Sequence, residues 1–356
     1  DGSSDTIPVI SVAPAPAVAA AIGQVATLRV AASGGDLPLS YQWRKNGTAI
    51  SGATNAEYRL TVDASSAANY TVTVSNYLGS ITSSATAVSL GSTMLLSESQ
   101  GGRLVLNPGA STSISAASGF VPAGASVQWK RNGFAIPGAT NPSLDLANAS
   151  PVRSNGRYTL EVSSAGTIRK SAVLHVAVAT PGKLVSWGSW QSGVPPVPAT
   201  LPPIMSFAAG LSEGYLFGLG LKSDGKVVSI PWGDTGGGQN SVPSTLDNVV
   251  QVAAGALHGV ALRSDGTVSA WGYNSRGQVS KVNGLSDAVA IAAAAEDTLV
   301  LKLDGTVVAA GLLTESVSVP ADLTDVVDIV GGMEHYMVLK SDGKVVAWGN
   351  GGSGRT

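Results

Sequence analysis

The sequence contains no cysteine. Disulfide bonds, thiolate metal sites and a cysteine nucleophile are therefore excluded. Charge is also scarce, because only 12% of the 356 residues are charged and the formal net charge is −2. Lysine and arginine are scattered singly, so the sequence offers no basic stripe that could neutralise a phosphate backbone. We therefore expect no nucleic-acid partner.

Long hydrophobic runs are missing as well. The longest candidate, residues 288–303, is interrupted by Glu296, Asp297 and Lys302, whereas a membrane-spanning helix needs about 20 apolar residues. We therefore expect no membrane insertion. No signal peptide is evident at the N-terminus, so residue 1 is expected to be the start of a mature or cut chain.

The sequence is rich in glycine, with 44 residues, and in small or β-branched residues, and it lacks long runs of Glu, Lys and Leu. β-Branched residues fit a pleated, half-buried surface, and glycine suits tight turns. This composition predicts an all-β protein built of short strands. A chain of this length is expected to form two or three domains.

The first half of the chain is an internal duplication. Three blocks recur in the same order, namely Gln42–Gly47 as Gln128–Gly133, Gly52–Asn55 as Gly138–Asn141, and Tyr70–Val74 as Tyr158–Val162. Apolar and polar residues alternate within each copy, as they do in half-buried strands. Each copy also carries an Asn-Gly pair, which favours a tight hairpin turn. The pattern predicts two β-sandwiches in tandem.

Both copies resemble the immunoglobulin fold in a cysteine-free form. Trp43 and Trp129 match the core tryptophan of that family. Tyr70 and Tyr158 match its tyrosine corner. Apolar residues stand at the position of its second cysteine: Val72 and Leu160. The resemblance implies that the two tryptophans are core residues and not platforms for a ligand.

The resemblance also places the domain limits and bears on the source. It implies one immunoglobulin-like domain over residues 1–91 and a second over residues 92–180. Secreted sandwiches from animals usually carry a disulfide between their sheets. Its absence favours a bacterial origin or a large, self-sufficient core.

A different repeat begins after Pro181. Each unit has two apolar strands, an Asp-Gly pair after the second, and a third strand that ends in Gly. The Asp-Gly pairs are Asp224-Gly225, Asp265-Gly266, Asp304-Gly305 and Asp342-Gly343. Each pair predicts a two-residue hairpin with glycine at positive φ. Trp232, Trp271 and Trp348 precede the closing glycine, and their rings are expected to pack against the neighbouring unit, because one unit cannot bury both of its faces.

This pattern resembles the repeats of the regulator of chromosome condensation superfamily. Gly255-x-x-His258 and Gly332-x-x-His335 match its Gly-x-x-His element, whereas Phe217 and Asp297 replace the histidine in the other two units. The resemblance implies an RCC1-like β-propeller over residues 181–356. The resemblance implies the seven-bladed propeller of that family.

The number of repeats in this chain is smaller. It holds about four blades and a spare strand at Lys183–Gly188. The chain is therefore a fragment of a longer one, which we favour, or an open arc of blades, or an incomplete propeller that a second molecule completes.

The sequence shows no catalytic constellation, and we expect a protein that is not an enzyme and binds no cofactor or metal. It has no Gly-x-Ser-x-Gly elbow, phosphate loop or dinucleotide fingerprint. The carboxylates outside the Asp-Gly turns are scattered, and they include Glu213, Glu296, Asp297, Glu315 and Glu334. The three histidines are expected to bond local backbone carbonyls and not to share a metal: His175, His258 and His335.

Three aromatic residues are candidates for contact with a ligand or partner. Six of the seven tryptophans occupy repeat positions, but Trp190 does not. An exposed tryptophan could stack on a sugar ring or anchor a protein partner. Alternatively, Trp190 covers the junction between the second sandwich and the first blade. Tyr215 and Tyr273 are weaker candidates of the same kind.

These observations favour a secreted or cell-surface bacterial protein with a binding or structural role, such as adhesion. The sandwiches would act as spacers, and the propeller loops would bind a protein or a glycan. Two alternatives stay open. One is a non-catalytic accessory region of a large extracellular polysaccharide-degrading enzyme. The other is a self-assembling fibre subunit, a homo-oligomer or filament joined through the incomplete propeller.

Overall fold

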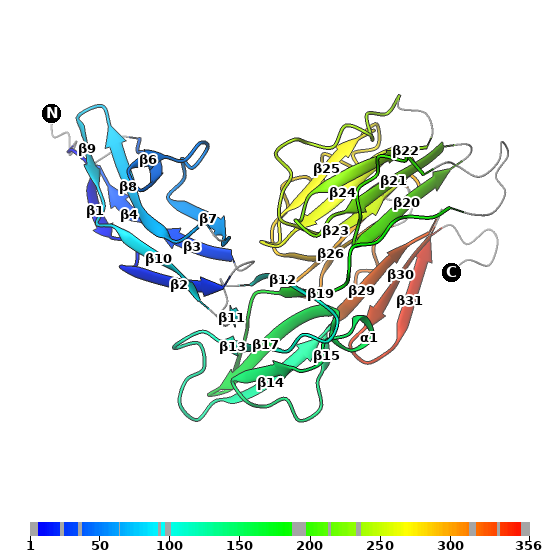
Figure 1. Ribbon diagram of the computed structural model, residues 1–356, viewed down its shortest axis with the longest axis horizontal. Coiled ribbons are helices and arrows are strands. Elements are labelled where there is room, and N and C mark those ends of the chain that lie inside the picture. The colour runs from blue at the N-terminus through cyan, green and yellow to red at the C-terminus, as the bar shows by residue number, and fades with distance from the viewer. Residues whose placement is uncertain are drawn as a thin grey trace.

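The computed structural model of the chain describes residues 6–21, 25–34, 38–63, 65–91, 94–96, 101–186, 197–212, 215–232, 236–312, 318–332 and 335–349. Within them, two β-sandwiches are followed by four three-stranded sheets (Figure 1). The predicted all-β class, with two immunoglobulin-like sandwiches and about four propeller blades, is therefore confirmed. The exact domain limits stay predictions. No helix of the described residues is long and apolar enough to cross a membrane.

The first sandwich has a six-stranded sheet with the order β2-β10-β8-β5-β6, in which β9 also pairs with β8. Opposite it lie the pairs β3–β7 and β1–β4. The strands are β1 (Val9–Val12), β2 (Ala17–Ala21), β3 (Val25–Arg29), β4 (Ala31–Ser33), β5 (Ser40–Lys45), β6 (Thr48–Ala49), β7 (Glu57–Thr61), β8 (Ala68–Asn76), β9 (Gly79–Thr82) and β10 (Thr86–Gly91).

The second sandwich repeats this design. Its six-stranded sheet has the order β12-β19-β17-β14-β15 with β18 on β17, and the sheet β11-β13-β16 covers it. The elements are β11 (Met94–Leu96), β12 (Gly102–Leu106), β13 (Thr112–Ala116), β14 (Ser126–Arg131), β15 (Phe134–Ala135), β16 (Ser143–Leu146), α1 (Pro151–Ser154), β17 (Gly156–Ser164), β18 (Thr167–Lys170) and β19 (Leu174–Val178).

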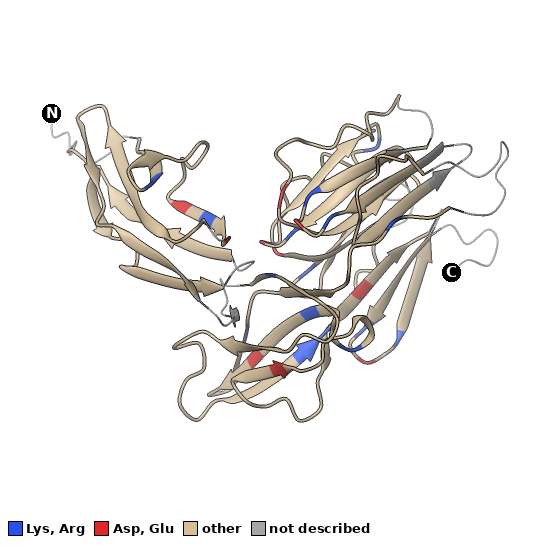
Figure 2. Cartoon of the chain, in the orientation of Figure 1, with Lys and Arg blue, Asp and Glu red and all other residues tan. Residues whose placement is uncertain are grey.

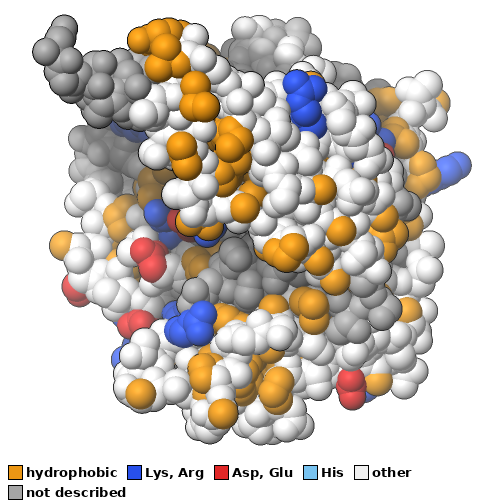
Figure 3. Space-filling view, turned by 90° about the vertical axis from the view of Figure 1, so that its left-hand side faces the viewer, with side chains coloured by type: hydrophobic (Ala, Val, Ile, Leu, Met, Phe, Trp, Pro, Cys, Tyr) orange, Lys and Arg blue, Asp and Glu red, His pale blue; other side chains and the backbone are white. Residues whose placement is uncertain are grey.

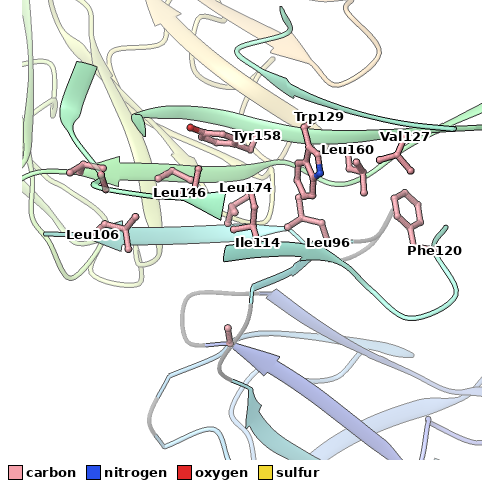
Figure 4. Packing of buried hydrophobic residues seen from close by; sticks show 14 of the residues in the cluster. Leu96, Leu106, Ile114, Phe120, Val127, Trp129, Leu146, Tyr158, Leu160 and Leu174 are labelled. Atoms are coloured by element: carbon pink, nitrogen blue, oxygen red, sulfur yellow. The ribbon is translucent and has the colours of Figure 1, made fainter. Parts of the chain in front are cut away.

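The duplicated tryptophans and tyrosines form the centres of the two cores. Trp43 and Trp129 are fully buried, and Figure 4 shows Trp129 between the two sheets, beside Leu160 and Leu96. The Tyr70 hydroxyl donates a hydrogen bond to the Ser66 carbonyl at 3.2 Å, and Tyr158 donates to the Ser154 carbonyl at 3.0 Å. Both predicted tyrosine corners are therefore confirmed, and the tryptophans are core residues as predicted.

The four blades are three-stranded antiparallel sheets whose first strands lie innermost. Blade 1 contains β20 (Ser206–Ser212), β21 (Tyr215–Leu221) and β22 (Val227–Pro231). Blade 2 contains β23 (Val249–Ala254), β24 (His258–Arg263) and β25 (Val268–Gly272). Blade 3 contains β26 (Ala288–Ala293), β27 (Asp297–Lys302) and β28 (Val307–Gly311). Blade 4 contains β29 (Val326–Gly331), β30 (His335–Lys340) and β31 (Val345–Gly349).

Each blade packs one sheet face against the next blade, and we call this its outgoing face. The opposite face, which receives the preceding blade, is its incoming face. Between blades 2 and 3, Val260 and Leu262 meet Ile291 and Val300 in one buried cluster. Trp271 lies on the incoming face of blade 2 and packs against blade 1. The predicted packing of the Trp271 ring against the neighbouring unit is confirmed.

The Asp-Gly turns differ from the prediction in their type. Gly225 has a φ of +79°, as predicted, but Asp224 is not among the residues with positive φ. The Gly225 N–H donates to the Lys222 carbonyl at 3.0 Å, and Lys222 N–H donates to the Lys226 carbonyl at 2.9 Å. These bonds define a three-residue loop, a type I turn closed by glycine in the left-handed region. The Asp224 carboxylate favours this turn because it accepts the Lys226 N–H at 3.0 Å.

The spare strand predicted at Lys183–Gly188 is not formed over residues 183–186, which belong to no strand. Only Gly182 forms a bridge, to Ile204. Residues 187 and 188 lie outside the described residues. Blade 1 has two more residues, Ile230-Pro231, before its Trp-Gly pair than the other blades have. The register shows this, because Gly218 lies opposite Ile230, whereas its counterpart Gly259 in blade 2 lies opposite Trp271.

Candidate functional site

The Asp-Gly end of the blades is docked on the second sandwich (Figure 1). Three basic side chains form a cross-strand row on the outer face of its larger sheet. Arg103 on β12 lies opposite His175 on β19, and Arg157 on β17 lies opposite His175 from the other side. Their neighbours along the strands, such as Leu174 and Tyr158, point into the core, so strand alternation directs the row toward the blades.

The two arginines in this row bind backbone carbonyls of the blades. Arg103 Nη2 donates to the Ser223 carbonyl at 2.7 Å, in the turn of blade 1. Arg157 Nη2 donates to the Val327 carbonyl at the start of blade 4, and it lies 3.4 Å from the Asp328 carboxylate. The two contacts therefore hold both ends of the blade array on one sheet. Hydrogen bonds that involve a charged group contribute about 1.5–3 kcal/mol each.

His175 lies between the arginines without sharing their charge. Burial, reinforced by the positive charges of Arg157 and Arg103, lowers the pKa of His175 to about 3. The ring is therefore neutral at physiological pH. The row contributes two cations and one neutral ring to the interface. This role differs from the expectation that His175 serves only a local backbone bond.

A turn of the second sandwich also touches blade 4. Asn132 and Gly133 both have positive φ, as predicted for a tight hairpin. A Cβ added at Gly133 would lie 2.3 Å from Val327 Cγ1, so the turn and blade 4 are in close contact. The same turn in the first sandwich is open, because a Cβ added at Gly47 would meet nothing within 4 Å.

Sequence reasoning missed this docking surface. The positions of Arg103, His175 and Arg157 correspond by register to small or neutral residues in the first sandwich, which are exposed there: Ala17, Ala87 and Asn69. The signal was therefore present in the duplication itself. The two copies keep the same core residues but differ on the outer face of the larger sheet, which indicates that this face has a different function in the second sandwich.

The opposite end of the blades points away from the second sandwich (Figure 1) and carries two of the three predicted contact residues. Tyr273 follows β25 directly and is 38% exposed. Tyr215 is the first residue of β21. Since β21 begins at this end of the blades and β25 ends at it, Tyr215 and Tyr273 lie at the same end. Nothing is described of the Tyr215 side chain. Trp190 lies outside the described residues.

The loop after Tyr273 is held by its own hydrogen bonds. The Tyr273 N–H donates to the Leu257 carbonyl at 2.8 Å. The Asn274 side-chain oxygen accepts the N–H groups of Val279 at 3.0 Å and Ser280 at 2.9 Å. Such a loop presents an exposed tyrosine with little conformational freedom to lose on binding.

A second exposed apolar site lies at the far tip of the first sandwich. Tyr77 and Leu78 stand at the tip of the β8–β9 hairpin and are exposed, as is Ile7 beside them. Figure 3, viewed from this side, shows hydrophobic side chains among neutral polar ones and few charges. The second sandwich has Ala165-Gly166 at the matching hairpin. The sequence analysis did not select this pair.

The blade histidines were predicted to bond local carbonyls, and this was wrong for His258. Its Nε2 lies 2.9 Å from Thr298 Oγ1 in the next blade. Thr298 itself donates to the Gln278 carbonyl at 2.9 Å, so the histidine Nε2–H is the donor. Burial lowers the pKa of His258 to about 4. The Gly-x-x-His spacing has a steric cause, because a Cβ at Gly255 would lie 2.2 Å from the His258 ring.

The scattered carboxylates do not assemble into a site within the described residues. Glu213, Glu315 and Glu334 lie outside these residues. Asp297 is buried beside the hydroxyl of Tyr336, whose pKa is raised by burial and by this carboxylate. No group of three or more metal-ligating side chains gathers in the described part of the chain. Figure 2 shows the charged residues dispersed singly or in pairs over the sheets.

Comparison with protein families identifies two kinds of domain. The immunoglobulin domain family matches residues 7–76. The regulator of chromosome condensation (RCC1) repeat family matches residues 249–278 and 326–355. The chain therefore carries an immunoglobulin domain and RCC1 repeats, as the sequence patterns predicted. A search of curated proteins found no match.

Several solved structures resemble parts of the chain. Prp20p from Saccharomyces cerevisiae is 22% identical over 44% of this chain and 47% of its own, with a TM-score of 0.36. The N-terminal Ig1-2 module of the Drosophila receptor protein tyrosine phosphatase DLAR is 20% identical over 49% of this chain and 99% of its own, with a TM-score of 0.24. The ectodomain of the Physcomitrella patens receptor kinase CR4 is 16% identical over 54% of this chain and 50% of its own, with a TM-score of 0.36. The chain thus spans about half the length of the yeast and moss proteins.

Proposed function

We propose that this chain is a non-catalytic binding protein that acts outside a bacterial cell and takes a protein partner on the free end of its blades. The single observation that carries the proposal is the division of the blades into two ends. One end is held on the second sandwich by Arg103 and Arg157. The other end presents Tyr273 on a loop fixed by Asn274.

The chemistry of this end favours a protein over a charged polymer. Tyrosine provides a large contact area at a low entropic cost and is enriched at the energetic centres of protein interfaces. Exposed polar residues, Asn274, Ser275 and Arg276, follow it, which gives the apolar ring a polar rim. A shallow groove lined by small residues lies at the same end of the blades, where the inner strands end, and it includes Ala254, Gly255 and Ala294. Immunoglobulin and RCC1-repeat domains are typical of proteins that bind other proteins.

An extracellular sandwich without cysteine needs a core that is stable without a disulfide. A bacterial protein with a large core meets this condition. Both sandwiches close their cores around a fully buried tryptophan, so they need no covalent bridge. The first sandwich then acts as the spacer, because it leaves its outer sheet face exposed. The second sandwich forms the base of the blades.

The experiment that tests the proposal places a photo-cross-linking amino acid at Tyr273 in the full chain. A matched control carries the same group at Ala87, which is exposed on the outer face of the first sandwich. Both proteins are added to intact cells and culture fluid of the source organism. We expect one defined cross-linked protein from position 273, competed by unlabelled chain but not by its Tyr273→Ala variant. Equal labelling from positions 273 and 87, or a cross-linked product that is an enzyme substrate and is turned over, would contradict the proposal.

A further inference from the structure

A pocket of about 290 Å³ lies between the second sandwich and the inner strands of the blades, and we call it the basal pocket. The basic row of the second sandwich lines one side of it, with Arg103, His175 and Arg157. The blades contribute Ser206 of β20 and Gln251 of β23 to the other side. The pocket therefore lies inside the docking interface, at the end of the blades opposite the proposed protein-binding end.

Docking of the blades uses only one nitrogen of each arginine. Every hydrogen bond from Arg103 to the blades begins at Nη2, and the same is true of Arg157. Within the described residues, Nε and Nη1 of these two side chains form no hydrogen bond. A guanidinium group has five N–H donors in a planar fork. Both arginines therefore keep donors for a further acceptor.

Other polar side chains of the pocket are also left with donors. The Asn132 Oδ1 accepts the Arg157 N–H at 2.9 Å, and the Asn155 Oδ1 accepts the Val178 N–H. Their Nδ2 groups form no hydrogen bond in the described part of the chain, and neither does the ring of His175. The neutral imidazole has one N–H donor. The pocket therefore holds more donors than its own acceptors can satisfy.

The charge of the pocket is positive. Among the described residues that line it, Asp328 is the one carboxylate, and it lies 3.4 Å from Arg157 Nη2. Since His175 is neutral, the cations of Arg103 and Arg157 against this carboxylate leave a net charge of +1. One carboxylate group would balance this charge, whereas a dianion would exceed it. The guanidinium fork also matches the planar geometry of a carboxylate.

The pocket is accessible from solvent. Asn132, Asn155 and Ser206 are exposed and form its mouth, whereas Arg103 is half-buried behind them. Burial lowers the pKa of the Arg103 guanidinium, although the charge of Asp224 opposes this effect. The cation is therefore partly desolvated, and a charge of opposite sign interacts more strongly with it than with a cation on an open surface.

We propose that the basal pocket binds the carboxylate group of a small organic acid, held by the remaining N–H donors of Arg103 and Arg157 on either side of His175. The ligand contacts the second sandwich and the blades at once, so it stabilises their docked arrangement. The proposal does not rest on the binding of a protein near Tyr273, which lies at the opposite end of the blades.

The test uses acetate as the probe, with acetamide as its uncharged match and chloride at the same ionic strength. NMR of the full chain at neutral pH follows the Nε–H signals of Arg103 and Arg157 and the ring signals of His175. We expect acetate to shift all three sets of signals saturably, with half-saturation below about 10 mM. Acetamide and chloride should leave them unchanged. Acetate should also slow hydrogen exchange in the docked Asp-Gly turns, because it binds only the docked form.

The duplication supplies a matched pair of control variants. Asn132 and Asn46 have φ values of +51° and +48°, and the side-chain oxygen of each accepts an N–H of the neighbouring strand, from Arg157 or Asn69. Asn132→Asp keeps this acceptor, removes a donor from the mouth of the pocket and adds a negative charge. We expect it to weaken acetate binding at least about tenfold, which corresponds to about 1.4 kcal/mol. Asn46→Asp makes the same change at the open turn of the first sandwich and should leave acetate binding unchanged.

Three outcomes would overturn the proposal. The first is the absence of saturable shifts with acetate. The second is an equal response to acetamide or chloride, since the pocket would then not recognise a carboxylate. The third is unchanged acetate binding in Asn132→Asp, or equal weakening in Asn132→Asp and Asn46→Asp, since the acetate would then be bound elsewhere on the chain.

Discussion

The duplicated Asn-Gly turn offers a matched test of how firmly the blades are docked. Gly133 in the second sandwich and Gly47 in the first have nearly the same φ, +84° and +82°. Replacing either with alanine places a Cβ in the left-handed region, which costs about 1–2 kcal/mol for a residue other than glycine. This backbone cost is the same in both variants. The comparison therefore isolates what surrounds the added methyl group.

The surroundings differ at the two positions. At Gly47 the new Cβ meets nothing within 4 Å. At Gly133 it would lie 2.3 Å from Val327 Cγ1 and 2.6 Å from Val327 Cβ, both atoms of blade 4. Val327 must move, and its carbonyl accepts the bond from Arg157. Overpacking of this kind costs about 1–3 kcal/mol, which corresponds to a docking equilibrium weakened by about 5- to 150-fold.

Docking is measured by hydrogen exchange at the turns that lie on the second sandwich and by small-angle scattering of the whole chain. We expect Gly133→Ala to speed exchange in these turns and to broaden the distance distribution. Gly47→Ala should lower the stability of the first sandwich and leave both docking signals unchanged. Val327→Gly removes both clashing atoms. The double variant Gly133→Ala/Val327→Gly should therefore dock more tightly than the sum of the two single changes implies.

The reasoning fails if Gly133→Ala and Gly47→Ala give the same docking signals. It also fails if the double variant shows only additive effects. Either result would mean that blade 4 does not press on the turn of the second sandwich in solution.

Three further predictions follow from the contacts. The double variant Arg103→Met/Arg157→Met should release the blades from the second sandwich. NMR titration should then show the pKa of His175 rising from about 3 toward the ordinary value of 6.5. An unchanged pKa would mean that the arginines do not hold the interface. The pKa of His258 is about 4 in the folded state and 6.5 in the unfolded state. The unfolded state therefore takes up the proton first as pH falls. The blades should lose about 3 kcal/mol of stability between pH 6.5 and 4. His258→Gln, which keeps a donor for Thr298, should flatten that dependence in acid-unfolding curves. Tyr158→Phe and Tyr70→Phe should each cost about 1 kcal/mol in urea unfolding, since each removes one buried hydrogen bond at a matched position.

The sequence was sufficient for the parts of the fold that repeat locally. The alternation around Trp43 and Trp129, the tyrosine corners and the Asn-Gly turns follow from strand period and turn chemistry, and the structure has them where predicted. The Asp-Gly turns show the limit of such reasoning. The Asp-Gly dipeptide correctly predicts positive φ at the glycine. However, the aspartate carboxylate accepts the N–H of the residue two positions later, and this bond stabilises a three-residue loop instead of the predicted two-residue loop.

The contacts between domains could not be read from the sequence in the same way. His258 and Thr298 are joined only because two blades stack in a particular register. The row of Arg103, His175 and Arg157 comes from three strands that are far apart in the sequence. Scattered single arginines are usually solvated, so nothing marked these two as interface residues except comparison with the other copy. Of the three aromatic candidates, the structure describes the side chain of Tyr273 alone.

The two sandwiches therefore carry different tasks on one fold, and this changes the idea that both are spacers. Their cores are equivalent, since each closes on a buried tryptophan and a tyrosine corner. Their outer sheet faces are not, since the first has Ala17, Ala87 and Asn69 exposed to solvent where the second holds the blades with two arginines. A sandwich whose sheet face is covered by another domain cannot turn freely against it. The second sandwich thus belongs mechanically to the blades, and any bending between a spacer and a binding head must occur between the two sandwiches.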